Sequence, residues 1–338
     1  MNKNILCIIL SLVIILGLIS ACASAGADEI DLTELDAGEM SDVDLGFLID
    51  DIIPLAGAPA ISLLLLPEAS GKMVKSNSSA VIDYSNTEDG YIMCAWLAKT
   101  DSRIKIILQG PETKYTYDLK NNGDYETFPL SDGSGDYTVG IYRNTTGTKY
   151  TKIISVSFTA KLTDELAPFL RPNQYVNFNE ESKTVAKAAE VCKDCTTNLE
   201  KVAAVYEWVI SRLTYDTDKA ADIKAGKIKS YIPDVDNILS IRKGICFDYA
   251  SLMSAMLRSQ GVPVKLITGT VKGGGNHAWI NVWSETEGWI TAAIYFNGET
   301  WERMDPTFAS SSRKSSSKTK QMVKYIGNGT NYTAKYQY

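Results

Sequence analysis

The chain has 338 residues, 45% of them apolar, which is long enough for two domains with hydrophobic cores of their own. It carries 34 Lys and Arg against 40 Asp and Glu, a formal net charge of −6 at pH 7. No basic stripe with interleaved aromatic residues occurs in it, so the composition excludes the usual signature of a nucleic-acid-binding protein. We therefore expect no nucleic-acid partner.

The first residues have the features of an export signal. Lys3 precedes an apolar run at 5–19 that is shorter than a typical membrane span, and small residues follow it. The junction Ile-Ser-Ala-Cys that ends at Cys22 is similar to the cleavage site of bacterial lipoproteins, whose cysteine receives lipid and becomes the new N-terminus. We expect 1–21 to be a signal peptide and Cys22 to anchor the protein on the outer side of a membrane. Cleavage at an Ala-x-Ala site such as 23–25, followed by plain secretion, is the alternative.

The acidic charge is concentrated behind this signal. Residues 22–71 contain eleven Asp and Glu and no Lys or Arg, whereas residues 72–338 contain 33 basic and 29 acidic residues. Such a segment is typical of a solvated spacer. Its apolar part, 52–66, is too short and too interrupted by proline and glycine to span a membrane, and we expect it to pack on the body or touch an interface. The sequence thus predicts an acidic spacer over 22–75.

Residues 76–165 are expected to form an all-β domain. Short runs rich in aromatic and β-branched residues alternate with turn clusters, which predicts seven strands: Ala80–Tyr84, Tyr91–Leu97, Ile104–Leu108, Tyr115–Leu119, Tyr125–Leu130, Tyr137–Tyr142 and Ile153–Ala160. Seven strands at this spacing suggest an immunoglobulin-like sandwich, a fold that binds, spaces or orients. The Asp- and Gly-rich clusters do not match the spacing of an EF-hand calcium loop, so hairpin turns are the preferred interpretation. Cys94 falls on a strand and is expected in the core.

After Pro172 the pattern becomes helical. Ser182 is positioned to begin one helix, and Thr197 with Glu200 forms a capping-box pattern at the start of a second.

A Cys-x-x-Cys pair, Cys192 and Cys195, lies between these two helices. A structural zinc site needs four ligands, and the remaining candidates are only Cys94, Cys246 and one histidine, so a metal site is disfavoured. Small core residues are the preferred interpretation, and an exported dithiol or disulfide stays open.

Cys246 stands at the start of the next helix. Apolar residues recur at helical spacing over 250–257, and Gly261 and Pro263 are placed where a helix ends. The unpaired backbone N–H groups and the positive dipole end of a helix N-terminus favour a thiolate over a thiol. A buried structural cysteine is the alternative.

A strand follows over 276–283, after a strand at 263–271 and the glycine run 273–275. Its small and aliphatic residues alternate with His277, Trp279, Asn281 and Trp283, which share the opposite face. His277 is the only histidine of the chain, so an imidazole base, if there is one, is this residue. Asp305, at the end of a later strand and before a proline, is either a turn former or a residue that orients the imidazole.

Three motifs, GxCxDYA at 244–250, HAW at 277–279 and DPT at 305–307, together resemble the core of the transglutaminase-like superfamily, within the papain-like cysteine enzymes. Their order and their separations of 31 and 28 residues agree with it, and the resemblance covers residues 182–338. It implies an α+β fold, that is, a papain-like, transglutaminase-type catalytic domain over 166–338 that follows the all-β immunoglobulin-like sandwich.

The resemblance also implies a triad, with Cys246 as the nucleophile, His277 as the base and Asp305 as the residue that orients the imidazole. The backbone N–H of Cys246 would be the first oxyanion donor, and the hydroxyl of Tyr215, which looks like the family's tyrosine before the catalytic helix, the second. Trp279 would line the substrate cleft, with core packing as its alternative. No metal or organic cofactor is required.

We therefore expect a surface enzyme that forms an acyl-enzyme at Cys246 from an amide of a protein or peptide. Two alternatives stay open: a cysteine peptidase or amidase that acts on surface proteins or cell-wall peptides, and a non-catalytic binding module that keeps the fold.

Overall fold

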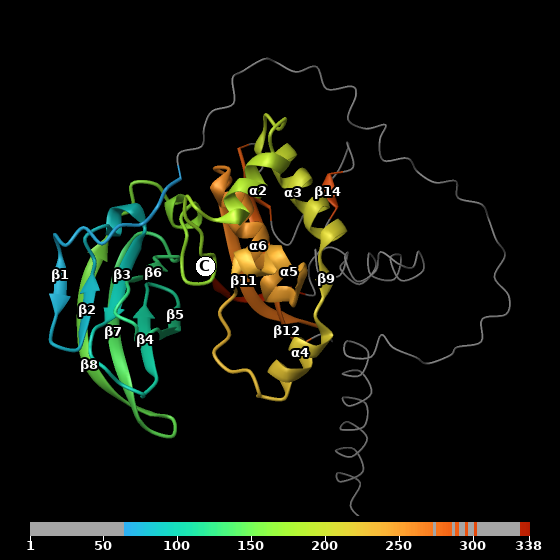
Figure 1. The fold of residues 1–338 in the computed structure, drawn as a ribbon. Helices are drawn as coiled ribbons and strands as arrows, with labels where there is room; N and C mark the ends of the chain where they lie inside the picture. The colour runs from blue at the N-terminus through green and yellow to red at the C-terminus, as the bar shows by residue number, and fades with distance from the viewer. Residues whose placement is uncertain (1–63, 273–274, 286–287, 291–294, 297–300, 303–331) are drawn as a thin grey trace, which may run out of the picture. The chain divides into compact units, whose positions relative to one another are not determined.

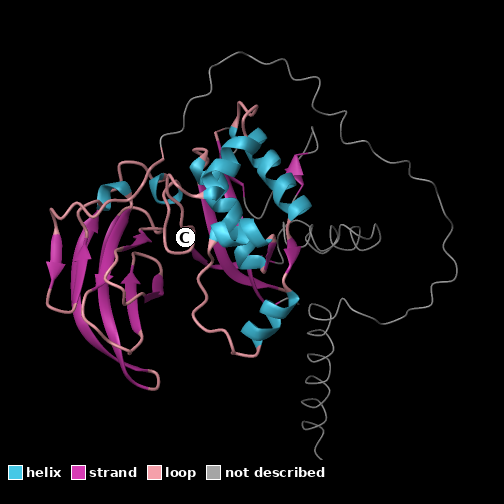
Figure 2. Ribbon diagram, viewed as in Figure 1, coloured by secondary structure: helices cyan, strands magenta, loops and turns pink. Residues whose placement is uncertain are grey.

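The structure is a computed structural model that describes residues 64–272, 275–285, 288–290, 295–296, 301–302 and 332–338 (Figures 1 and 2). The described residues belong to one compact unit, and the domain boundary expected near residue 165 stays a prediction. Cys22, the acidic spacer up to residue 63, and Asp305 lie outside the described residues. No helix within the described ranges is long and apolar enough to cross a bilayer.

Eight strands come first and form two antiparallel four-stranded sheets, with the orders β1-β2-β3-β6 and β5-β4-β7-β8. Their bounds are β1 Val74–Ser76, β2 Ala80–Asp83, β3 Tyr91–Trp96, β4 Ile104–Gln109, β5 Lys114–Leu119, β6 Glu126–Pro129, β7 Gly135–Thr146 and β8 Lys149–Ala160. All seven predicted strands are confirmed. β1 was not predicted, because its three residues are all exposed and show no apolar alternation.

Side chains from both sheets enter one hydrophobic core. Burial alternates along β4 and β5, so that one face of each strand lies inside, as the period of two in a strand requires. Every residue of β3 is buried, including Cys94, which is 0% exposed. Burial, followed by the negative charges of Glu126 and Asp83, raises the pKa of the Cys94 thiol far above its ordinary value. The predicted core position of this cysteine is confirmed.

The helical part of the chain contains five α-helices among the described residues, and two short strands lie between them: α2 Lys183–Val191, α3 Asn198–Arg212, β9 Thr214–Tyr215, α4 Thr217–Lys224, α5 Val235–Ile241, β10 Lys243–Gly244 and α6 Cys246–Ser259. The capping box at Thr197 and Glu200 is present at the start of α3.

At α2 the first N–H groups have a partner that the sequence did not indicate. Ser182 occupies the N-cap position, but the acceptor is the carboxylate of Asp236 on α5. It lies 3.1 Å from the N–H of Lys183 and 2.8 Å from that of Thr184, and it also accepts the Thr184 hydroxyl at 2.7 Å. The cap therefore joins two helices that are about fifty residues apart in the chain.

The helix α6 ends as predicted. Gly261 adopts φ +79°, and its N–H donates to the carbonyl of Arg258 while that of Val262 donates to Leu257. These two hydrogen bonds form a Schellman motif, in which glycine avoids the steric penalty that a Cβ would add in the left-handed region.

A third antiparallel four-stranded sheet, ordered β13-β12-β11-β16, packs against α6 through β11 and β12. Its strands are β11 Val264–Val271, β12 Gly275–Ser284, β13 Gly288–Ile290 and β16 Tyr332–Gln337, and a separate pair is formed by β14 Tyr295–Phe296 and β15 Trp301–Glu302. The strand β16, which was not predicted, pairs with β11 through a bulge at Thr268 and Gly269. A Cβ at Gly269 would collide with the Thr333 carbonyl and lie 2.8 Å from Trp279, so glycine is needed for this close approach.

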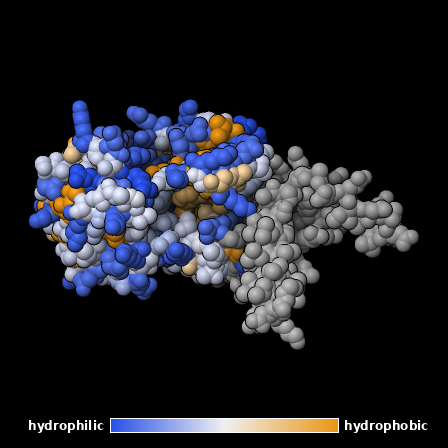
Figure 3. Space-filling view, turned by 90° about the horizontal axis from the view of Figure 1, so that it is seen from below, coloured by the Kyte–Doolittle hydropathy of each residue, from blue (hydrophilic) through white to orange (hydrophobic). Residues whose placement is uncertain are grey.

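Exposed apolar side chains are dispersed. The large ones with the greatest exposure come from separate parts of the described chain, and on the face drawn in Figure 3 hydrophobic residues form small groups between hydrophilic ones. They are Met73, Val74, Leu97, Tyr125 and Ile241.

Candidate active site

Cys246 is the first residue of α6, as the sequence predicted. The N-cap, Ile245, has an extended backbone, and the cysteine itself is half-buried, with its side chain against the main hydrophobic core. A helix start leaves backbone N–H groups without intrahelical partners, and these groups stabilise negative charge. The position thus suits a thiolate nucleophile and an oxyanion that forms beside it.

Tyr215 is brought to the same place by strand pairing. The two-residue strands β9 and β10 run parallel, and Tyr215 is the register partner of Gly244, two residues before Cys246. The next N–H, that of Asp216, donates to the Gly244 carbonyl at 2.9 Å. The proposed second oxyanion donor and the nucleophile are therefore carried by adjacent backbone segments, while the role of the Tyr215 hydroxyl stays a prediction.

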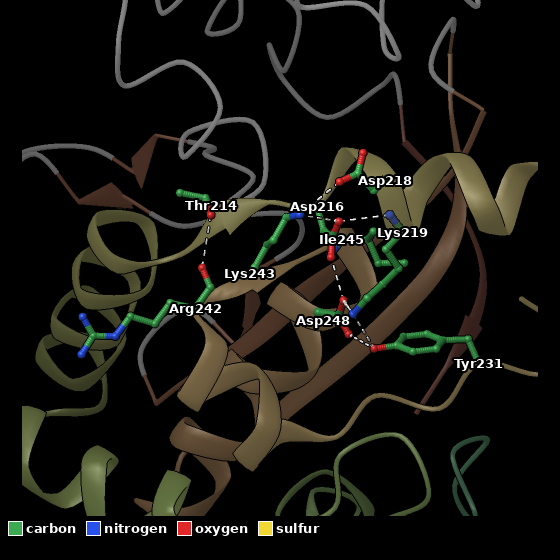
Figure 4. Close-up of polar contacts among 9 residues, drawn as sticks. All are labelled: Thr214, Asp216, Asp218, Lys219, Tyr231, Arg242, Lys243, Ile245 and Asp248. Carbon is green, nitrogen blue, oxygen red and sulfur yellow. Dashed lines mark hydrogen bonds and ion pairs between the residues drawn. The ribbon is translucent and has the colours of Figure 1, made fainter.

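A buried carboxylate holds the start of α6 (Figure 4). The side chain of Asp248 is 0% exposed, and its Oδ2 accepts the backbone N–H of Ile245 at 2.8 Å and the Lys219 ammonium at 2.9 Å. Its Oδ1 accepts the hydroxyl of Tyr231 at 2.5 Å. Lys219 also donates to the Tyr231 oxygen at 3.0 Å, which closes the cluster. A Cβ at residue 244 would lie 2.5 Å from the Asp248 Cβ, so Gly244 is required for this packing.

A second ion pair fixes the turn from which Lys219 extends. Asp216 is the N-cap of α4, and its carboxylate accepts the backbone N–H of Lys219 at 3.0 Å and lies 3.1 Å from the Lys243 ammonium. Burial acts to raise the pKa of Asp216, but the Lys219 N–H and the Lys243 cation outweigh it and keep that pKa below its ordinary value. Lys243 also approaches Asp218 at 3.4 Å (Figure 4).

His277 lies near the beginning of β12, where it is half-buried and paired with Gly269 of β11. Its ring is 6.4 Å from that of Trp279, and the two planes are 22° apart. Tyr332 of β16 contacts both rings, at 6.2 Å from His277 and 5.2 Å from Trp279. The helix that begins with Cys246 packs against the strand that carries His277, and the pairing of thiol and imidazole stays a prediction.

Trp279 is only 3% exposed, because Ile267 and Tyr332 pack on it. Trp279 was expected to line the substrate cleft, with core packing as the alternative, and Tyr332 of β16 covers it on the face that also carries His277. Neither Asp305, the expected orienting residue, nor Cys22, the expected lipidation site, lies within the described residues.

Lys219, Tyr231 and Tyr332 were missed at the sequence level. The only signal for the first two was Asp248 itself, an acidic residue in the first turn of a helix with no capping Ser or Thr before it. Nothing local pointed to Tyr332. In the part of the chain that the structure describes, no three His, Cys, Asp or Glu side chains are grouped as metal ligands would be.

The region that holds Cys246 and His277 is similar to known proteins. Residues 185–306 match a family model described as the transglutaminase-like superfamily. A UPF0252 protein of Archaeoglobus fulgidus is 29% identical over 137 residues, which are 37% of this chain and 39% of the relative. The chain thus spans about two fifths of the length of this curated relative.

Two solved structures are more distantly similar. One is described as a "Putative Cysteine Protease" from Cytophaga hutchinsonii, with 16% identity and a TM-score of 0.36 over 73% of this chain and 83% of that one. The other is the transglutaminase of red sea bream, with 12% identity and a TM-score of 0.24 over 64% and 48%. TM-scores this low do not establish a shared fold.

Proposed function

We propose that the chain is a cysteine acyltransferase of the transglutaminase-like superfamily, whose family model matches residues 185–306. Cys246 attacks the carbonyl of an amide in a protein or peptide, releases the amine and holds the acyl group as a thioester. His277 takes the thiol proton and passes it to the leaving amine, and Asp305 orients the imidazole through its second ring nitrogen.

One observation carries the proposal: the half-buried Cys246 begins a helix, beside the Tyr215 strand, inside the segment that matches the family. Because Cys246 is the first residue of α6, its backbone N–H has no acceptor within the helix. This N–H can donate to the oxyanion of the tetrahedral intermediate. A single helix-start donor of this kind contributes a factor of about 10²–10³ to kcat.

The acceptor decides between transfer and hydrolysis. Water is present at about 55 M, so an amine wins only where the protein positions it and excludes water. The aromatic group at Trp279 and Tyr332 beside the imidazole is the feature that favours transfer, because it places apolar surface next to the proposed base. A peptidase or amidase outcome is the second candidate, and it uses the same Cys246 chemistry.

The test incubates the mature protein with a library of glutamine-containing and cell-wall peptides and a tagged primary amine, and follows products by mass. We expect tagged peptides from the parent protein and none from Cys246→Ala. Cleaved or deamidated peptides without tag would assign the protein to hydrolysis. No product of either kind would place the non-catalytic binding module first.

Export and anchoring complete the proposal. The signal-like segment before Cys22 supports a lipid-anchored protein outside the cytoplasm, with protein or peptide substrates at the cell surface. Mass spectrometry of the protein from its native host should find lipid on Cys22. A Cys22→Ala variant that still fractionates with membranes would contradict the anchor.

We also propose that the two N-terminal sheets form an immunoglobulin-like domain that orients substrates. Strands β2, β3 and β6 on one side and β5, β4, β7 and β8 on the other contribute buried side chains to one core, which continues into the helical part of the chain. Two sheets that share a core are typical of sandwiches of that class. Limited proteolysis of the whole protein should give a resistant fragment that ends near residue 165, and steady cleavage within β4 or β7 would argue against such a unit.

A further inference from the structure

We propose that Lys219 and Tyr231 are positioning residues for Cys246: they neutralise and hold the buried Asp248 carboxylate, which in turn fixes the backbone at the start of α6. The inference rests on the proposed nucleophilic role of Cys246, and it identifies which other residues keep that thiol reactive.

The first step is the cost of the carboxylate. The Asp248 side chain is fully buried, and a buried unpaired carboxylate costs several kcal/mol, unless hydrogen bonds and an opposite charge compensate it. Here three donors do so, namely the Ile245 N–H, the Lys219 ammonium and the Tyr231 hydroxyl. The Lys219 side chain is 16% exposed, so solvent screens this pair little.

The second step is location. Asp248 lies in the first turn of α6, two residues after Cys246, and the N–H that it accepts belongs to the residue just before the cysteine. Its carboxylate therefore holds the Gly244–Ile245 peptide unit, which lies one unit before the peptide bond to Cys246. Tyr231 reaches it from the segment before α5, and Lys219 from the first turn of α4 (Figure 4).

The third step is charge. Without a cation, the negative Asp248 would oppose a thiolate within the same helical turn, whereas the Lys219–Asp248 pair is neutral. The other ionisable groups near the start of α6 are the Asp216–Lys243 pair, Tyr175 and Tyr215, and His277 on β12. Within the described structure, the cation that contacts Asp248 is Lys219 and not one of these groups.

The fourth step concerns Tyr231. Burial and then the hydrogen bond to Asp248 raise the pKa of its hydroxyl well above the ordinary range, so the group remains a donor at every pH at which the protein works. The Lys219 ammonium also lies 4.9 Å from the centre of the Tyr231 ring, which adds a cation–π contact to the cluster.

The experiment measures iodoacetamide labelling of Cys246 across pH, read by mass spectrometry on the intact folded protein. No substrate is needed, so the result is independent of whether the protein proves to be a transferase, a hydrolase or neither. Lys219→Met should move the labelling profile to higher pH and slow labelling at pH 7 about tenfold, as expected for a displacement of one pH unit. Lys219→Arg, which keeps the charge, should recover most of the rate.

Two further variants separate charge from structural loosening. Lys219→Met combined with Asp248→Asn removes both charges and keeps the shape, so the profile should return toward that of the parent. Lys227→Met removes a 72% exposed lysine just after the same helix and should change nothing. Thermal unfolding of each variant reports whether it is folded.

Three outcomes would overturn the proposal. They are a Lys219→Met profile identical to the parent, a double variant no faster than Lys219→Met, and an equal loss in the Lys227→Met control. Absence of amide turnover in the parent, with the labelling pattern as expected, would instead reject the proposed function and leave the role of Lys219 in place.

Discussion

At the scale of single residues, the proposed chemistry depends on one imidazole. His277 is the only histidine among 338 residues, and the structure places it in contact with the rings of Trp279 and Tyr332. An aromatic surrounding of this kind restricts the orientations of the imidazole and limits the access of water.

His277→Ala should therefore abolish nearly all turnover, because no second histidine can replace the base. We expect kcat/KM to fall by a factor of about 10²–10⁴, the usual contribution of a general base. The measurement is steady-state amine incorporation or hydrolysis, whichever the parent shows. Asn276→Ala, at the exposed neighbouring position, serves as the matched control and should keep the parent rate. Parental turnover by the His277 variant would rule out the proposed base.

At the scale of elements, the starts of α2 and α6 and the end of α6 are tied to residues of other segments. The start of α6 is held by Lys219 of α4 and Tyr231, and the start of α2 by Asp236 of α5. Lys201 of α3 reaches the end of α6, where its ammonium donates to the Gln260 carbonyl at 2.8 Å. The helix α6 is thus held at both ends by residues of neighbouring segments.

Asp236→Ala should lower the free energy of unfolding by about 1–2 kcal/mol, the usual cost of a lost N-cap. It leaves the N–H groups of Lys183 and Thr184 without their acceptor and removes a link between α2 and α5. Urea unfolding followed by circular dichroism measures the change. Asp194→Ala removes an 87% exposed carboxylate near the other end of α2 and should not shift the midpoint. If the two variants unfold at the same midpoint, the cap does not contribute as inferred.

At the scale of the whole molecule, Arg258 connects segments that are far apart in the chain. Its guanidinium donates to the carbonyls of Val264, Arg171 and Tyr338, at distances of 2.6–3.0 Å. Burial lowers the pKa of Arg258 to about 9, which still leaves it charged at pH 7. Tyr338, in turn, packs edge-on against Tyr115 and Tyr117 of β5. This arginine therefore joins α6 to the end of β16, the edge strand of the sheet β13-β12-β11-β16.

Arg258→Met should cost about 3 kcal/mol or more, because the side chain fits the space but removes the guanidinium donor from three carbonyls, of which that of Tyr338 keeps the N–H of Leu266. For Arg258→Lys the loss of unfolding free energy should lie between zero and that of Arg258→Met, since one ammonium cannot reproduce the planar fork of a guanidinium. Thermal and urea unfolding check both variants. Arg212→Met, at an exposed position of α3, is the control and should unfold like the parent. A loss below about 1 kcal/mol for Arg258→Met would contradict the inferred role.

Much of the architecture follows from local pattern. The seven predicted strands, the capping box of α3, the Schellman end of α6 and the placement of Cys246 at a helix start all depend on residues within a few positions of one another. Apolar alternation and capping chemistry act over that range, so the sequence was sufficient for them. It was also sufficient for the family, because the motifs at Cys246 and His277 lie within the matched segment.

The tertiary structure decided what depends on contacts between distant segments. Trp279, for which cleft lining and core packing were both open, is buried, because Tyr332 of β16, which pairs with β11, packs on it. Asp248 meets Lys219 and Tyr231 across 29 and 17 residues, and Asp236 caps α2 across 52. Partners at such separations leave no periodic trace in the chain, since their meeting depends on how helices and strands pack. By itself the sequence therefore determined the candidate nucleophile and base, and only the folded chain determined what surrounds and holds them.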